Sequence, residues 1–335
     1  MLGYIEILAG DHAAGRAHAR EVQRIAKISG DVHREARGLY NEALSVISLG
    51  DYRKCITLTR RGRTALSLCG LSHGTLNYVL MGIQAEVHKL KSEYVEAHDI
   101  RNQILQATAD DNYQQALSLI NIADINILTG VPMPQIQSKI DASRAIANTS
   151  ENMFTLLCDT IQANLNLREG DMSHTLFCKC LQLGWRMDSE IAKEKLGIYK
   201  ALQFLGDAFL QEEDEVTATS LFTLALEGFT ELDVHHSRAE CMIRLGDISN
   251  RHGNVLKALE LWEQARPLFE RSSQAKRVQH IDERLVRISE DIKEQHKMNL
   301  ARLTDLNTSV GTVEELDEDL QEDELENEAA RLVAV

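Results

Sequence analysis

One stretch of the sequence, between residues 202 and 265, contains the same pattern twice at an offset of 40 residues. Each copy begins with leucine, glycine and aspartate, and continues with an alanine, a large aromatic residue and a second alanine at identical intervals. So many matches at one offset are hard to obtain by chance, which indicates a structural repeat. The matched pairs are Leu205 and Leu245, Gly206 and Gly246, Asp207 and Asp247, Ala218 and Ala258, Phe222 and Trp262, and Ala225 and Ala265.

The spacing within each copy, LG…A-x3-F/W-x2-A, resembles the helix–turn–helix unit of tetratricopeptide repeats. In such a unit, small residues stand where two helices touch, and the aromatic side chain fills the space against the neighbouring unit. The pattern therefore predicts an all-α protein, folded as a right-handed superhelical solenoid with a concave and a convex face. Because the standard unit has about 34 residues, a period near 40 predicts that both helices are longer by about a turn.

The repeat continues through the rest of the chain and predicts about seven units. A small residue recurs every 38 to 43 residues, at Gly3, Ala43, Ala85, Ala123, Ala163, Gly206 and Gly246. Seven residues further on, each first helix is expected to end, at Gly10, Gly50, Ser92, Gly130, Gly170, Glu213 and Gly253. Glycine suits this position because it accepts the left-handed backbone conformation. Twelve residues beyond the first small residue a second one follows in most units, with Gln135 and Thr175 as exceptions.

Three regions are predicted from this pattern: a repeat array in residues 1–272, a capping helix in 273–303 and an acidic, disordered tail in 304–335. The first unit is expected to be incomplete, because Gly3 falls in the middle of a helix. A chain cut from a longer protein would account for this, and so would a short first helix. The partner helix, about residues 11–29, would then expose an apolar face. Apolar residues of the capping helix are Val278, Ile281, Leu285, Ile288 and Ile292.

The net charge of −15 argues against nucleic acid as a partner, because phosphate-binding surfaces need clustered Lys and Arg. Ten Asp and Glu residues lie between Glu314 and Glu328, and removing these ten charges from −15 leaves −5 for the rest. No apolar run approaches the roughly 18 residues that a membrane span requires. The six cysteines show no zinc or disulfide spacing, which is typical of reduced thiols. We therefore expect a cytoplasmic protein without a membrane segment.

Motifs of catalysis and cofactor binding are absent from the sequence, which has no GxxxxGK[ST], GxGxxG, HExxH or GxSxG pattern. The closest approach to a metal site is His174 with Cys178 and Cys180, but Cys180 falls on a different side of a helix from the other two. Packed thiols are the better interpretation. His235 and His236 are predicted to lie in a surface loop. We predict a non-enzymatic protein with no cofactor and no metal.

One set of polar residues follows the repeat. The residue directly after the small residue faces the concave groove in tetratricopeptide arrays, and from the third unit onward it is acidic or an amide. We hypothesise that these side chains form a ladder along the groove, which binds a protein or peptide carrying Lys, Arg or free N–H donors. Such a groove would not bind an anionic C-terminus. The alternative is that each acidic group only satisfies local hydrogen bonds. The predicted groove residues are Glu86, Asp124, Asn164, Asp207 and Asp247.

Beyond the general repeat, residues 116–125 (ALSLINIADI) and 256–269 (LKALELWEQARPLF) resemble the repeat regions of STAND proteins from mushroom-forming (basidiomycete) fungi. In that family such arrays often follow a nucleotide-hydrolysing NACHT or NB-ARC domain. The resemblance covers about residues 2–300. Because this sequence has no nucleotide-binding domain, no ATPase activity carries over, and the resemblance implies a sensor or partner-recognition role.

Two functions follow from these observations. The first is a non-enzymatic scaffold that binds a partner segment in its concave groove. The second is the ligand-sensing, regulatory repeat arm of a truncated STAND-type switch ATPase. A basic peptide that binds the isolated chain would favour the first, whereas dependence on an upstream domain would favour the second.

Overall fold

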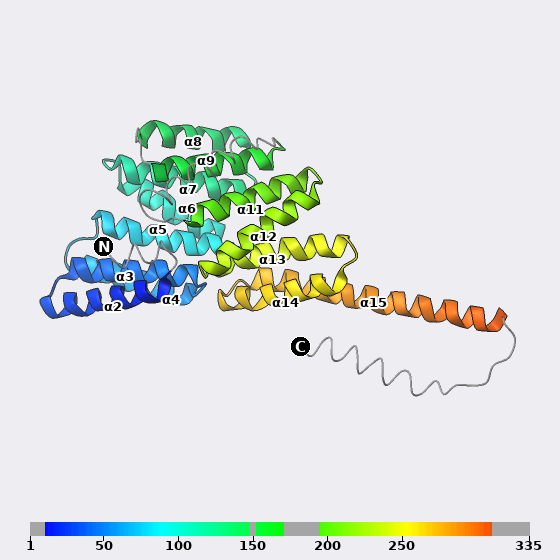
Figure 1. Cartoon of the computed structure of the whole chain (residues 1–335). Coiled ribbons are helices and arrows are strands. Elements are labelled where there is room, and N and C mark those ends of the chain that lie inside the picture. The colour runs from blue at the N-terminus through cyan, green and yellow to red at the C-terminus, as the bar shows by residue number, and fades with distance from the viewer. Residues whose placement is uncertain (1–10, 148–151, 171–194, 310–335) are drawn as a thin grey trace. The chain divides into compact units, whose positions relative to one another are not determined.

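The structure is a computed structural model that describes residues 11–147, 152–170 and 195–309 of the 335-residue chain (Figure 1). Within these ranges the chain forms thirteen α-helices and no β-strand. The predicted all-α fold is therefore confirmed. The chain divides into two compact units, residues 1–282 and residues 283–335.

Helix–turn–helix pairs follow one another along the first unit, and consecutive pairs pack against each other. This arrangement confirms a solenoid of tetratricopeptide-like repeats. α2 (His12–Ser29) and α9 (Asn152–Arg168) belong to two further repeats, whose other halves lie outside the described residues. The complete pairs are α3 (Val32–Ser48) with α4 (Tyr52–Leu68), α5 (Thr75–Leu90) with α6 (Tyr94–Ala107), α7 (Asn112–Leu128) with α8 (Met133–Ala147), α11 (Lys195–Gln211) with α12 (Glu215–Glu231), and α13 (His235–Arg251) with α14 (Val255–Arg271).

The last helix, α15 (Ala275–Ser309), begins in the first unit and continues into the second. It starts close to the predicted beginning of the capping helix. It continues past residue 303, so the first residues of the predicted disordered tail are helical. The rest of that tail, from residue 310, lies outside the described residues, as does the predicted incomplete helix around Gly3. No helix among those described is both long enough and apolar enough to cross a membrane.

Aspartate side chains cap five helices of the first unit at their N-termini. Each carboxylate accepts a hydrogen bond of 2.9–3.1 Å from the backbone N–H three residues later. This bond satisfies a donor that has no partner inside its own helix. Short polar turns therefore determine where the helices begin. The capping residues are Asp11, Asp31, Asp51, Asp111 and Asp214.

The predicted ends of the first helices coincide with left-handed backbone. At the six predicted positions that the structure describes, φ lies between 61° and 78°. Two of these positions, Ser92 and Glu213, are not glycine, and a side chain in this conformation costs about 1–2 kcal/mol. The six residues are Gly50, Ser92, Gly130, Gly170, Glu213 and Gly253.

The glycines of the duplicated pattern allow aromatic rings to approach the first helix of their own repeat. A Cβ atom at Gly206 would lie 2.9 Å from the Phe222 ring, and one at Gly246 would lie 2.5 Å from the Trp262 indole nitrogen. Any larger side chain would overlap with the ring. Phe222 is fully buried and Trp262 nearly so. The repeated spacing of glycine and aromatic residue therefore reflects how the two helices of one repeat pack against each other.

Gln135, which departs from the small-residue pattern in the sequence, is exposed, and Ile136 and Ile140 of α8 fill the core instead. The start of α8 after Pro132 shifts the buried face of this helix by one residue. One local expectation from the sequence is wrong. His235 was expected in a surface loop, but it begins α13 and is buried. His174, Cys178 and Cys180 lie outside the described residues.

Within the first unit, the first repeats contact the last ones. The Nε2 atom of buried His12 in α2 lies 2.8 Å from the carbonyl oxygen of Leu232, which precedes α13. Gly50 also lies close to the last repeats. A Cβ atom built on Gly50 would lie 3.4 Å from the Cβ atom of Ser272 and 3.7 Å from that of His235. These contacts join residues more than 180 positions apart in the chain.

Candidate functional site

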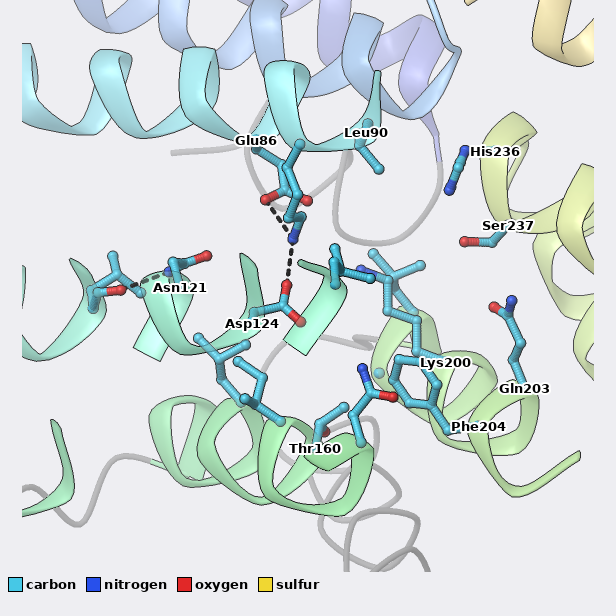
Figure 2. A pocket seen from close by; sticks show the side chains of 18 of the residues that line it. Glu86, Leu90, Asn121, Asp124, Thr160, Lys200, Gln203, Phe204, His236 and Ser237 are labelled. Carbon is cyan, nitrogen blue, oxygen red and sulfur yellow. Dashed lines mark hydrogen bonds and ion pairs between the residues drawn. The ribbon is translucent and has the colours of Figure 1, made fainter. Parts of the chain in front are cut away.

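A pocket with a volume of about 570 Å³ opens among the first helices of successive repeats (Figure 2). Most lining side chains come from α5, α7, α9, α11 and α13; Ser92, Tyr94 at the start of α6 and Arg277 at the beginning of α15 complete the lining. All of the lining residues belong to the first unit. The first helices are the ones that the repeat predicts to face the concave groove.

Helical periodicity explains how one helix contributes so many side chains. The five lining residues of α7 are spaced by three or four positions, so they form one stripe along the helix. The same spacing recurs in α9, from Phe154 through Leu157 and Ile161 to Asn164. Each stripe carries apolar residues near its N-terminal end and an amide or acid further on. The α7 stripe is Tyr113, Leu117, Asn121, Asp124 and Leu128.

The apolar wall of the pocket is partly open to solvent. The Tyr113 and Phe154 rings contact each other, with centroids 6.4 Å apart. Phe154 is buried, but Tyr113 and Leu128 remain 43% and 48% exposed. Large apolar side chains in a concave site are the surface on which a partner's apolar side chain gains most from burial.

A three-residue ion network occupies the middle of the pocket. The Lys89 ammonium lies 2.9 Å from the Glu86 carboxylate and 2.7 Å from the Asp124 carboxylate of the next first helix (Figure 2). Burial by itself would lower the pKa of Lys89, but the two carboxylates outweigh burial and raise it. Burial would likewise raise the pKa of Glu86, and Lys89 and Lys200 reverse that effect and lower it. Glu86 is therefore ionised, and both carboxylates are already paired with Lys89.

Other polar groups surround this network. Lys200 of α11 is exposed and forms no ion pair with another residue in the described part of the chain. Arg277 lies 3.0 Å from Glu240. Desolvation lowers the pKa of His236, whose Nδ1 atom is 3.0 Å from the amide nitrogen of Gln274. His236 is therefore a neutral, hydrogen-bonded group near neutral pH.

Three amide side chains also line the pocket, one from each of α7, α9 and α11. Asn121 donates a hydrogen bond of 2.7 Å to the Leu117 carbonyl. Asn164 and Gln203 have no hydrogen-bond partner among the described residues. An amide offers both a donor and an acceptor, so it can pair with the backbone of an extended segment.

The predicted groove residues divide into two groups. Glu86, Asp124 and Asn164 lie together in the pocket. Asp207 and Asp247 do not line it; Asp207 pairs instead with Arg244, at 2.8 Å. Burial raises the pKa of Asp207, although Arg244 acts in the opposite direction. This pocket therefore contains three of the five predicted groove residues, and the ladder along the whole groove stays a prediction.

Several lining residues were missed by the reasoning from sequence. Lys89 could have been found, because it lies three positions after Glu86 on one helix face, where ion pairs form. The apolar wall of Tyr113 and Phe154, and the cation Lys200, follow no repeat position that the sequence pattern singled out.

No family model matches the chain, and no curated protein matches it. Among solved structures, the chain is similar to a Rap protein complexed with competence and sporulation factor. The TM-score is 0.61, the sequence identity is 14%, and the match covers 83% of this chain and 77% of that chain. At this identity the likeness shows the shared helical-repeat fold.

Proposed function

We propose that the chain is a non-enzymatic interaction scaffold that binds a segment of a partner protein or a peptide in the pocket. The observation that carries this proposal is the convergence of side chains from five successive first helices on one cavity of about 570 Å³. The cavity combines an open apolar wall, which supplies burial, with two amides that have no hydrogen-bond partner among the described residues and can pair with a backbone. A protein of the same fold is complexed with competence and sporulation factor, which supports a binding role.

The chemistry of the partner differs from the expectation that carboxylates alone would select a basic segment. Lys89 already pairs with Glu86 and Asp124, and Arg244 pairs with Asp207. A basic partner would have to displace these cations from the carboxylates. Its net gain in binding free energy would be only the difference between the new ion pair and the one it replaces. The paired carboxylates thus weaken the case for a basic partner, and the apolar wall becomes the main source of affinity.

The test is selection of peptides from a random library by the full chain, followed by measurement of their affinities for two variants. Leu128→Glu places a charge on the exposed apolar wall and should abolish binding of the selected peptides. Leu224→Glu is the matched control, because Leu224 of α12 is similarly exposed, at 52%, and lies outside the pocket. Equal affinity for both variants would refute the pocket as the binding site, provided that both keep wild-type circular dichroism.

The predicted alternative, a regulatory arm of a fungal STAND-type switch ATPase, stays a prediction, as does the cytoplasmic location. It would be favoured by partner binding that occurs only when a NACHT or NB-ARC domain is attached to the chain. The same selected peptides can serve as ligands in that comparison.

A further inference from the structure

We propose that the partner segment carries a carboxylate, bound by Lys200, beside an apolar side chain that packs on the Phe204 and Phe154 side of the pocket. This inference rests on the proposed function and specifies the partner that the pocket selects. It reverses the expectation that this face rejects an anionic group.

The first argument is the balance of ion pairs. Both carboxylates that line the pocket, Glu86 and Asp124, contact Lys89. Arg277 contacts Glu240, which does not line the pocket. Lys200 is the cation of this lining that has no ion-pair partner among the described residues. The charge of Lys200 also helps to lower the pKa of Glu86. Lys200 can nevertheless contact a ligand without breaking an ion pair, whereas each of the two carboxylates already contacts Lys89.

The second argument is the set of uncharged donors around Lys200. Gln203 lies three positions further along α11, on the same helix face, and has no hydrogen-bond partner among the described residues. Ser237 at the start of α13 is 7% exposed, and its hydroxyl can donate into the pocket. Figure 2 shows Lys200, Gln203, His236 and Ser237 grouped on the same side of the pocket. A carboxylate bound there would gain neutral hydrogen bonds in addition to the charge of Lys200.

The third argument places the apolar neighbour. Phe204 is one helical turn from Lys200 on α11 and lines the same cavity. Phe154, Leu157 and Ile161 of α9 add further apolar side chains to the lining of this cavity. A ligand whose carboxylate contacts Lys200 therefore has an apolar surface directly beside it, and the adjacent side chain should be apolar.

The experiment compares three random nonapeptide libraries, selected by the full chain under equal conditions. One library has a free C-terminal carboxylate, the second is amidated at the C-terminus and lacks Asp and Glu, and the third is amidated but contains Asp and Glu. We expect enrichment from the first library if the carboxylate is terminal and from the third if it is a side chain. We expect none from the second. Dominant enrichment from the second library, or of peptides rich in Lys and Arg, would overturn the inference.

Variants of Lys200 then test whether this residue binds the carboxylate. Lys200→Met should weaken binding of the enriched peptides by about 10- to 100-fold, the loss expected for a charge-assisted hydrogen bond. Lys200→Arg should retain most of the affinity, and Lys200→Glu should shift selection toward basic peptides. Lys257→Met, on the exposed face of α14, is the matched control and should change nothing.

The outcomes separate this inference from the proposed function. If selected peptides lose affinity with Leu128→Glu but not with Lys200→Met, the pocket binds a segment and the carboxylate inference is wrong. If no library yields a peptide that is sensitive to Leu128→Glu, both the proposed function and this inference are wrong.

Discussion

The contact between the first and last repeats predicts a loss of stability at mildly acidic pH. His12 is buried, and its Nε2 atom donates to the carbonyl oxygen of Leu232, so the neutral ring carries its proton on Nε2. The Nδ1 atom has no hydrogen-bond partner among the described residues. Protonation there would place a charge and an unpaired N–H in the interior, which is costly.

The sign of the effect follows from the pKa of His12. Burial lowers this pKa, although the hydrogen bond to Leu232 and the charge of Asp233 act in the opposite direction. In the unfolded chain the histidine titrates near its ordinary value of about 6.5. Below that pH the unfolded state binds a proton that the folded state resists. The free energy of unfolding should therefore decrease as the pH falls below about 6.5, by at most about 1.4 kcal/mol per pH unit for this group.

Two variants separate the titration from the contact. His12→Gln keeps a side-chain N–H donor but does not titrate, so the free energy of unfolding should depend less on pH in this variant. Some pH dependence should remain, because burial also lowers the pKa of His236. His12→Ala removes the donor and leaves the Leu232 carbonyl without it, which should cost about 1–3 kcal/mol at neutral pH. The control is His33→Gln, at an exposed position of α3.

Urea unfolding followed by circular dichroism, at several values between about pH 8 and about pH 5, measures both effects. The reasoning would be refuted if His12→Gln and the wild type lost stability equally over this range. It would also be refuted if His12→Ala were as stable as the His33→Gln control at neutral pH.

Three further predictions concern packing and backbone, and urea unfolding tests each of them. Gly246→Ala should lower stability by about 1–3 kcal/mol, because its Cβ would overlap with the Trp262 indole; an unchanged midpoint would contradict this. Glu213→Gly should raise stability by about 0.5–1 kcal/mol by relieving left-handed strain at φ 62°, and a decrease would show that the side chain contributes more than the strain. Lys89→Met should lower the free energy of unfolding by up to about 3 kcal/mol, because its two carboxylate partners lose their shared cation. A variant more stable than the wild type would show that the ion network destabilises the fold.

The parts of the fold that the sequence predicted depend on residues close together in the chain. A left-handed φ at Gly50 or Gly253 reflects the conformational preference of one residue. The contact of Gly206 with Phe222 spans 16 positions within one repeat, so it could be predicted from the spacing that recurs in the sequence. At Gln135, where the sequence departs from the repeat after a proline-containing turn, the buried residue of α8 is Ile136, one position further on.

The candidate site was predicted only in part. The repeat position after each small residue identified Glu86, Asp124 and Asn164, which do lie in one pocket. It did not show that Asp207 pairs with Arg244 instead, because the two residues come from different repeats. Nor could it show the ionic partners of the acids, since Lys89 reaches Asp124 from a different repeat.

The sequence by itself determined the kind of architecture: an all-α chain of tetratricopeptide-like pairs, with the positions of its turns and of its close helix contacts. These features come from local backbone preference and from packing within a repeat. Only the tertiary structure decided which charges are paired, that His12 contacts Leu232, and that apolar and amide side chains share one pocket. The physical reason is that Coulomb interactions and burial depend on distance in space, and residues 35 or 220 positions apart approach one another only when the repeats have stacked.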